Sequence, residues 1–507
     1  MARCLPPAHR TGICIESMGL LNLTPRQVRA IFGDPQDLRM HTQSQAKPAQ
    51  MPPISRDPLI CIIGAGSSGI AAAKVLAQAG IRFDCFEKSD CVGGMWVFKN
   101  SNGLSSAYRS LHINTSRDKM AYSDFPMPAD FPDYPHHTQI AQYFNAYVDH
   151  FGFREHIRFR TGVEEVSRRE DGRFDVRLDT GESRIYDGVC VANGHHWDPR
   201  FPDPPISGQF DGVQLHSHHY VDPAEPHDLR GKRIVIVGFG NSALDIACEL
   251  GRKENCPEVW LSMRRGYWVI PRYFGSKVLD YASPHPSQDP PWLMRALPGW
   301  LRAWLIEQRI RAITGLPQEH GLPAPDHPFG ASHPAISHEI YNRIGSGDVR
   351  IKPDIARFEG KRVHFRDGSQ IEADAIMYCT GYHIRFPFFK EGFLSVTNND
   401  IALWKRMIEP RFPNLYFIGL VQPLCAMMPI AEEQAKLMRD HLLGQYLAPP
   451  LARMEKERDS MHQAVKAHYV PSARHTIQID CAAYTYDLRR ELRKGRKRAL
   501  AAQAGLA

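Results

Sequence analysis

The chain carries short, continuous apolar runs that end at or beside a glycine. Such runs are typical of parallel strands that are covered on both faces of a sheet. They occur at Leu59–Ile63, 188–194, Arg233–Val237, 375–382 and 415–420. With the helical segments that follow two of them, they predict an α/β fold built on two Rossmann-like dinucleotide-binding domains.

Two other patterns lie between these runs. Residues 67–79, 139–151 and 242–250 predict helices. Alternation of apolar and polar residues, interrupted by turns that contain glycine, predicts antiparallel strands. These strands fall into two sets, at 159–166, 174–178 and 183–186, and at 349–352, 361–365 and 370–373.

The first apolar run leads into a glycine-rich turn. Gly64, Gly66 and Gly69 follow the G-x-G-x-x-G pattern, in which the glycines allow a tight turn, approach of a pyrophosphate and close helix packing. The N-terminus of the next helix favours phosphate because its N–H groups are free and its dipole is positive there. Glu87 ends the following strand, 18 residues after Gly69, where a carboxylate accepts hydrogen bonds from a ribose.

A second turn of this kind follows Arg233–Val237. Gly238, Gly240 and Ala243 form G-x-G-x-x-A, and the next strand ends in arginine rather than in an acid. Arg264 lies 26 residues after Gly238, close to the 23 residues that separate Gly64 from Glu87. A basic residue at this place suits the 2′-phosphate of NADP. Two different dinucleotide sites in one chain indicate electron flow between NADPH and a flavin.

Length and composition narrow the class of protein. A chain of 507 residues with 43% hydrophobic and 23% charged residues is typical of a globular protein with at least two domains. The 11 cysteines lack paired metal spacing, so we expect no metal, no disulfide framework and a reducing compartment. The three histidines His216, His218 and His219 lie close together, but no acidic or cysteine partner stands at ligand spacing. No apolar run reaches the length of a membrane span.

Two segments leave alternatives open. The helix expected at about 292–313 has Trp300, Leu301, Trp304 and Leu305 on one face, which favours packing across the domain junction over contact with a membrane surface. The net charge of +7 comes largely from the basic run 489–498. We interpret that run as a solvated helix end rather than as a site for nucleic acid or anionic lipid.

A third motif gives these sites a family context. The segment from Phe210 to Tyr220 matches F-x-G-x-x-x-H-x-x-x-[FY], a signature that lies between the two fingerprints in the class B flavin-containing monooxygenases. The order GAGSSG, EKSDCVGGMW, NTSRDKM, YSDFP, GFGNSA, CTGY and GLVQP agrees as well. The chain therefore resembles this family over about residues 58–490.

The resemblance implies a chemistry that the spacing alone does not show. FAD would occupy the first turn and NADPH the second. The reduced flavin and dioxygen would form a C4a-hydroperoxyflavin, which passes one oxygen to the nitrogen of an amine or the sulfur of a sulfide. The implied architecture is a three-layer FAD domain with an inserted NADP domain. The expected ranges are 1–55 (extension), 56–221 with 353–450 (FAD), 222–352 (NADP, with a helical insertion) and 451–507 (helical, basic tail).

The resemblance also assigns roles to residues. Asn114 is the expected catalytic residue, supporting the oxygenated flavin by hydrogen bonds to the cofactors and not by proton abstraction. His216 and Tyr220 are expected to couple the domains. The remaining cofactor-binding residues expected for FAD are Gly64, Ala65, Gly66, Ser67, Ser68, Gly69, Glu87, Lys88, Gly94, Met95, Trp96, Ile113, Thr115 and Gln422, and those for NADPH are Gly238, Gly240, Asn241, Ser242, Ala243, Asp245 and Arg264.

Three other functions fit part of these patterns. A Baeyer–Villiger monooxygenase would act on a ketone with the same cofactors, but that group typically has Trp where this signature has Tyr220. A disulfide reductase would need a redox-active cysteine pair near the flavin, and the sequence indicates none. A non-catalytic adaptor would use the helix at 292–313 and the basic tail. We expect dioxygen and a small nucleophile or ketone as substrates, a cytoplasmic location and no nucleic acid partner, while membrane contact and a homodimer stay open.

Overall fold

The computed structural model of the chain describes residues 57–292 and 296–505, so the predicted extension at 1–55 lies outside the described residues. Its first sheet has the strand order β22-β23-β7-β1-β2-β3. All neighbours pair in parallel except β22 with β23. The strands are β1 (Leu59–Ile63), β2 (Arg82–Phe86), β3 (Ile157–Arg158), β7 (Gly188–Val191), β22 (Ile408–Glu409) and β23 (Phe412–Phe417).

The second sheet has the order β16-β11-β10-β20-β9 and is parallel throughout. Its strands are β9 (Val213–His216), β10 (Arg233–Val237), β11 (Glu258–Ser262), β16 (Val349–Lys352) and β20 (Ala375–Tyr378). Strands β9 and β20 lie outside the range 222–352 expected for the second domain. The sequence pattern gave no indication of this, because a buried run looks the same in either sheet.

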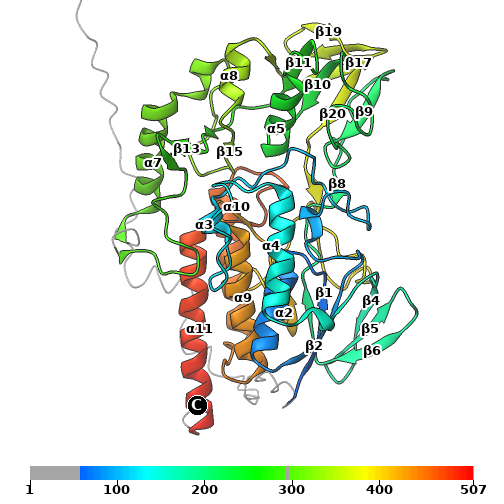
Figure 1. Ribbon diagram of the computed structural model, residues 1–507. Helices are drawn as coiled ribbons and strands as arrows, with labels where there is room; N and C mark the ends of the chain where they lie inside the picture. Colours follow the sequence, from blue (N-terminus) through cyan, green and yellow to red (C-terminus); the bar gives the residue numbers. More distant parts are fainter. Residues whose placement is uncertain (1–56, 293–295, 506–507) are drawn as a thin grey trace, which may run out of the picture. The chain divides into compact units, whose positions relative to one another are not determined.

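The two units repeat one plan, which confirms the predicted α/β, Rossmann-type fold (Figure 1). In each unit a strand, a helix and a second strand are followed by a three-stranded antiparallel sheet, and the chain then returns beside the first strand. The helices are α2 (Ser67–Gln78) and α5 (Asn241–Leu250). The antiparallel strands are β4 (Val163–Arg168), β5 (Phe174–Leu178) and β6 (Ser183–Tyr186), and β17 (Ile355–Glu359), β18 (Arg362–Phe365) and β19 (Gln370–Glu372).

The central strand of each sheet buries side chains on both faces. Ile60 and Ile62 of β1 join a core cluster with residues of α2, whereas Cys61 and Ile63 join another with residues of β4–β6. Successive strand residues point to opposite faces, so a run without polar residues requires a layer on each side. The strand β10 is divided between two clusters in the same way.

The other elements lie outside these two sheets. The longer helices are α4 (His137–His150), α7 (Gly299–Thr314), α9 (Met427–Leu442), α10 (Leu451–His468) and α11 (Cys481–Gln503). The short elements are α3 (Arg117–Met120), α8 (Ile340–Gly345), β8 (Asp198–Pro199), β12 (Val269–Ile270), β13 (Tyr273–Phe274), β14 (Lys277–Val278), β15 (Ala335–Ile336), β21 (Tyr382–His383), β24 (Gln422–Pro423) and β25 (Gln478–Ile479).

The basic run 489–498 lies on α11 and is largely exposed, as we expected, but several of its arginines form ion pairs. Arg489 pairs with Asp289 and Glu433, and Arg496 pairs with Asp440. Within α11, Arg498 pairs with Glu491. These acids compensate part of the charge of the run. Asp289, Glu433 and Asp440 lie on other segments, so the composition of the run itself does not reveal them.

The helix α7 also differs from the expectation. Trp300 is 72% exposed, Trp304 52% and Leu305 47%, and Ile310 is its one buried residue. The predicted packing of these apolar side chains across a domain junction is therefore wrong for the described residues. Nearby, Trp292 is 71% exposed as well.

A disulfide joins Cys425 to Cys481, which the expectation of a reducing compartment without a disulfide framework did not include. The two residues are 56 positions apart in the sequence. The strands β24 and β25 pair in parallel, with Pro423 opposite Ile479, so each cysteine follows two residues after its strand. This long-range pairing brings the thiols together, and nothing in their spacing indicates it.

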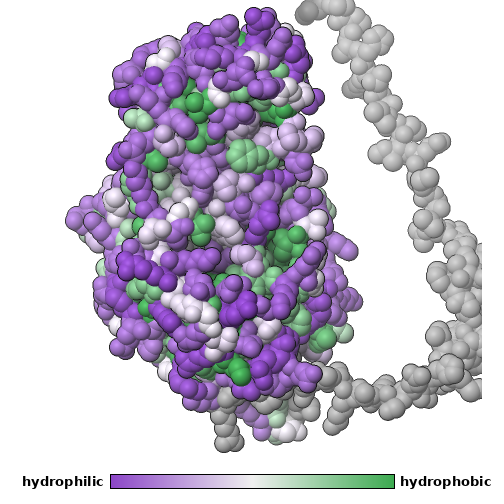
Figure 2. All heavy atoms as spheres, turned by 90° about the vertical axis from the view of Figure 1, so that its right-hand side faces the viewer, coloured by the Kyte–Doolittle hydropathy of each residue, from purple (hydrophilic) through white to green (hydrophobic). Residues whose placement is uncertain are grey.

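The outer surface is mainly hydrophilic on the side that carries β4–β6. Figure 2 shows this face, where apolar side chains form small, separate patches. In the described part of the chain, no helix combines the length and apolar character that a bilayer crossing requires.

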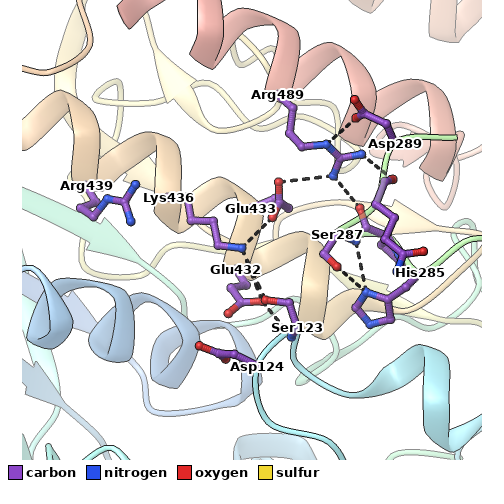
Figure 3. Close-up of polar contacts among 12 residues, drawn as sticks. Ser123, Asp124, His285, Ser287, Asp289, Glu432, Glu433, Lys436, Arg439 and Arg489 are labelled. Atoms are coloured by element: carbon purple, nitrogen blue, oxygen red, sulfur yellow. Dashed lines mark hydrogen bonds and ion pairs between the residues drawn. The ribbon is translucent and has the colours of Figure 1, made fainter.

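A buried charge network fixes the fingerprint helix α2 to α9, and Figure 3 shows the polar contacts around Glu432 and Glu433 on the α9 side. Lys74 of α2 contacts Glu432 of α9 at 2.9 Å and Asp124 at 2.5 Å. Lys74 and Glu432 are 2% and 0% exposed, so neither charge has water as an alternative partner. The backbone N–H of Ser123 donates a further hydrogen bond to Glu432, at 3.0 Å. The network thereby orients the helix whose N-terminus forms the first glycine turn.

We expect Lys74→Met to lower the free energy of unfolding by about 3–5 kcal/mol, because it leaves the buried Glu432 carboxylate without its closest cation. The matched variant Lys436→Met removes a partly exposed cation 3.9 Å from the same carboxylate and 2.8 Å from Glu433, which keeps Arg489 as a partner. It should cost at most about 1 kcal/mol. Urea unfolding of both variants measures the difference, and equal losses would contradict the assignment.

The same network predicts a dependence of stability on pH. Burial raises the pKa of Glu432, but Lys436 and Lys74 outweigh it and hold that pKa below the ordinary value of 4.5. A carboxyl with a lowered pKa in the folded state stabilises the fold fully above its unfolded pKa and less as pH falls through the folded one. The gap between the wild type and Lys74→Met should therefore narrow below about pH 4.5.

Candidate functional site: two glycine turns

The turn between β1 and α2 has the geometry expected of a phosphate-binding turn. Gly64 has φ +99°, and a Cβ there would stand 2.8 Å from the carbonyl oxygen of Ala192, at the end of the neighbouring strand β7. A Cβ on Gly69 would stand 1.8 Å from the carbonyl oxygen of Gly64. Only glycine fits at either place, and the result is a helix N-terminus pressed close to the strand.

The N-terminus of α2 is open for an anion. Its N-cap is Gly66, which has no side chain to occupy the free N–H groups. The short 3-10 helix η1 (Gly94–Trp96) lies against this turn, and the N–H of Gly93 donates to the carbonyl of Ala65 at 3.0 Å. Met95 and Trp96 are half-buried beside it. The structure thus brings the first fingerprint together with Gly93 and the helix η1.

Glu87 stands at the end of β2, beside the same turn. Its carboxylate is buried and accepts backbone N–H groups from Ala65 and Ser89, both at 2.8 Å. These bonds fix the orientation of the Glu87 carboxylate. A carboxylate at the end of the second strand is placed to accept hydrogen bonds from the hydroxyl groups of a ribose. The neighbouring Lys88, also expected at the site, has an exposed side chain.

The turn between β10 and α5 repeats this geometry. Gly238 has φ +115°, and a Cβ there would stand 2.5 Å from the carbonyl oxygen of Cys379, just after the neighbouring strand β20. The N-cap of α5 is Gly240, and Ala243 is buried at the third position of the motif. The first two glycines and the helix N-terminus are therefore arranged for a second dinucleotide.

Two arginines follow β11, and they differ in their partners. Arg264 is exposed and makes no ion pair or hydrogen bond with any residue in 57–292 or 296–505. Arg265 pairs with Asp326 at 2.7 Å. Arg264 is thus the cation that a phosphate at this strand end would meet first.

Two of the expected NADPH residues have protein partners. Asn241 accepts the backbone N–H of Ile336 at 2.9 Å, and Asp245 accepts the hydroxyl of Tyr108 at 2.5 Å. Burial raises the pKa of the Asp245 carboxyl, although the bond from Tyr108 opposes the shift. Tyr108 is a residue that motif reasoning missed, and it links the loop after η1 to α5. Ser242, between the two, is half-buried.

The expected catalytic amide lies in an ordered turn. Ile113 is buried and its N–H donates to the carbonyl of Pro135 at 3.0 Å, and the N–H of Ser116 donates to Asp280 at 2.9 Å. Between them, the half-buried side chains of Asn114 and Thr115 make no hydrogen bond to the described residues. The turn is held on both sides while these two side chains remain available to a ligand.

Gln422, expected near the flavin, belongs to a segment that contacts the first turn. Three residues before it, a Cβ on Gly419 would stand 2.0 Å from the hydroxyl oxygen of Ser68. Gly419 also donates its N–H to Gln434 of α9 at 2.8 Å. The end of β23 therefore lies against the first turn of α2.

Phe210, His216 and Tyr220 of the signature are buried and make contacts within the protein. Tyr220 is 1% exposed and donates its hydroxyl to Glu249 of α5 at 2.9 Å, and Phe210 packs on Phe358. Burial lowers the pKa of His216 to about 4, so this imidazole is neutral at physiological pH. Within the described ranges, no three His, Cys, Asp or Glu side chains are grouped as metal ligands.

Comparisons with known proteins identify the family of the chain. The model of the family "Flavin-binding monooxygenase-like" matches residues 58–499. The flavin-containing monooxygenase 5 of Oryctolagus cuniculus is 34% identical over 444 residues, covering 83% of this chain and 80% of its own length. The dimethylaniline monooxygenase (N-oxide-forming) 2 of the same species is 32% identical over 391 residues, covering 74% and 72%.

Solved structures share the fold. The S-allyl-L-cysteine S-oxygenase from Allium sativum has a TM-score of 0.63 at 23% identity, over 87% of this chain and 89% of that one. A cyclohexanone monooxygenase has a TM-score of 0.64 at 16% identity, over 87% and 99%. The two glycine turns and the family match lead to one conclusion. The chain belongs to the flavin-binding monooxygenase-like family, as an NADPH-dependent flavin monooxygenase that uses FAD and NADPH.

Proposed function

We propose that this enzyme transfers one oxygen atom from dioxygen to a soft nucleophile, the nitrogen of an amine or the sulfur of a sulfide. The observation that carries the proposal is the pair of glycine turns. One lies next to the carboxylate Glu87, and the other next to Arg264, which has no partner within 57–292 or 296–505. An NADPH site and a flavin site in one chain supply electrons and an oxygen-activating group without a metal.

The residues of the chain would then bind and orient the cofactors. The N-termini of α2 and α5 would hold the two pyrophosphates, and Glu87 the FAD ribose. When bound, the flavin supplies activated dioxygen. The amide of Asn114 can both donate and accept hydrogen bonds, so it would hold the cofactors in register and keep water from the reactive centre. Thr115 and Gln422 would complete this junction.

The domain limits follow from sheet membership. We propose that the NADP domain contains β9, β10, β11, β16 and β20, together with β17–β19. The FAD domain then comprises the segments before β9 and after β20. The C-terminal helices α10 and α11 follow it as a separate helical segment.

Oxidation of a ketone is the second candidate reaction. Tyr220 at the last signature position favours oxidation at nitrogen or sulfur, whereas the cyclohexanone monooxygenase structures are named for a ketone. Heavy-oxygen-labelled dioxygen distinguishes the outcomes when thioanisole, N,N-dimethylaniline and cyclohexanone are offered separately. Labelled sulfoxide or N-oxide supports the proposal. Labelled lactone alone supports the second candidate, and peroxide in proportion to the NADPH consumed, with no labelled product, contradicts both.

The exposed side chains of α7 favour one further property, contact with an anionic membrane surface. Trp300, Trp304 and Leu305 project from one helix that also carries arginines, so apolar rings and positive charges are exposed on the same element. We expect the wild type to sediment with vesicles containing phosphatidylserine, and the double variant Trp300→Ala/Trp304→Ala to stay in the supernatant. Equal sedimentation of both proteins, or of neither, would contradict a role for α7.

We expect Arg264→Ala to raise KM for NADPH by roughly ten- to a hundredfold, since a charge-assisted contact to the 2′-phosphate is lost. KM for NADH should change little, because NADH lacks that phosphate. Steady-state kinetics with both nucleotides measures the difference. The same change in both KM values would rule out the 2′-phosphate assignment.

We expect Asn114→Ala to retain FAD while product formation falls sharply and the NADPH consumed appears as peroxide. The reason is that the amide acts on the bound cofactors and not on the fold. The control Asn145→Ala removes an amide on α4 that donates to the carbonyl of Ala141 and accepts a hydrogen bond from Arg154. If Asn114→Ala makes as much product as this control, Asn114 has no catalytic role.

A further inference from the structure

An arginine from the C-terminal segment lies over the second glycine turn. Arg474 lies between α10 and β25. If Gly240 carried a Cβ, that atom would stand 3.4 Å from Nη1 of Arg474, 3.9 Å from Cζ and 4.0 Å from Nη2. The guanidinium therefore lies across the middle glycine of the motif, the position at which a pyrophosphate comes closest to the backbone.

Among the described residues, this cation has no anionic partner. Arg474 is half-buried and makes no hydrogen bond or ion pair with the residues that the structure describes. Burial lowers its pKa, which shows that its surroundings disfavour the charge. A charge that is removed from water without a partner is costly, so such a residue is typically retained for a ligand of opposite charge.

The neighbouring titratable groups do not neutralise it. Burial lowers the pKa of His196 and of His475 to about 4, and that of His333 well below its ordinary value, each with a contribution from Arg474. The three imidazoles are therefore neutral at pH 7, and Arg474 carries the positive charge of the cluster. The N-terminus of α5, capped only by Gly240, adds a second feature that favours an anion at the same place.

The backbone around Arg474 is held firmly. The ring of His475 lies 2.9 Å from the carbonyl of Val470 and 3.2 Å from the hydroxyl of Ser332. Four residues after Arg474, Gln478 pairs with Gln422 in β24. The guanidinium is thus presented by a fixed segment, so little order has to be gained when a ligand binds.

We propose that Arg474 binds the pyrophosphate of NADPH and closes the second turn from its open side. The inference rests on the proposed function, in which NADPH occupies that turn. It separates two tasks: Arg264 would recognise the 2′-phosphate that distinguishes NADPH from NADH, and Arg474 would bind the bridge that the two nucleotides share.

The test measures binding and not turnover. Dissociation constants of NADP⁺, NAD⁺ and adenosine 2′-monophosphate are determined by titration calorimetry on the FAD-loaded wild type and on Arg474→Ala, Arg474→Lys and Arg264→Ala. We expect Arg474→Ala to weaken NADP⁺ and NAD⁺ by the same factor, roughly ten- to a hundredfold, and to leave adenosine 2′-monophosphate unchanged. Arg474→Lys should retain part of the affinity. Arg264→Ala should weaken the binding of NADP⁺ and of adenosine 2′-monophosphate and leave that of NAD⁺ unchanged.

Two results would overturn the proposal: unchanged NADP⁺ affinity in Arg474→Ala, or an equal loss for adenosine 2′-monophosphate, which has no pyrophosphate. The control Arg453→Ala removes an exposed arginine of α10 that pairs with Glu457 and should bind all three ligands as the wild type does. Failure of the wild type to bind NADP⁺ is a different result. It would remove NADPH from the second turn and refute the proposed function itself.

Discussion

The close approach of a carbonyl group to the first glycine of each turn is the constraint on which both sites depend. In each unit the carbonyl comes from the end of the strand that pairs beside the central one, Ala192 next to Gly64 and Cys379 next to Gly238. The returning strand therefore shapes the turn as much as the motif itself does. The two sites are products of complete sheets, and a peptide with either motif alone would lack the neighbour that sets its geometry.

Local patterns were sufficient for the parts of the fold that are contiguous in sequence. The strands β1, β2 and β10 and the helices α2 and α5 were predicted within one or two residues, because buried runs and glycine turns have strong local signals. The assignment of β9 and β20 to the second sheet could not be predicted, since it is a matter of pairing. The exposed tryptophans of α7 show a related limit, because an apolar helix face does not reveal whether anything covers it.

The features that the sequence did not reveal join distant segments. Arg474 lies 234 positions after Gly240, and Arg489 pairs with Asp289 across 200 positions. No spacing rule connects such residues, since their proximity follows from how α9, β25 and α11 pack. The candidate site was thus predictable at its two glycine turns and at the residues after β2 and β11, but the cation that faces the second turn required the tertiary structure.

The bond between Cys425 and Cys481 has a consequence for the covalent connectivity of the chain. It closes a loop that contains the whole of α10, a helix whose surface is largely exposed. Proteolytic cleavage within that helix would not release the C-terminal piece, because the bond still ties α11 to the start of α9. Such a nicked chain would migrate as one species until a thiol reductant separated it into two fragments.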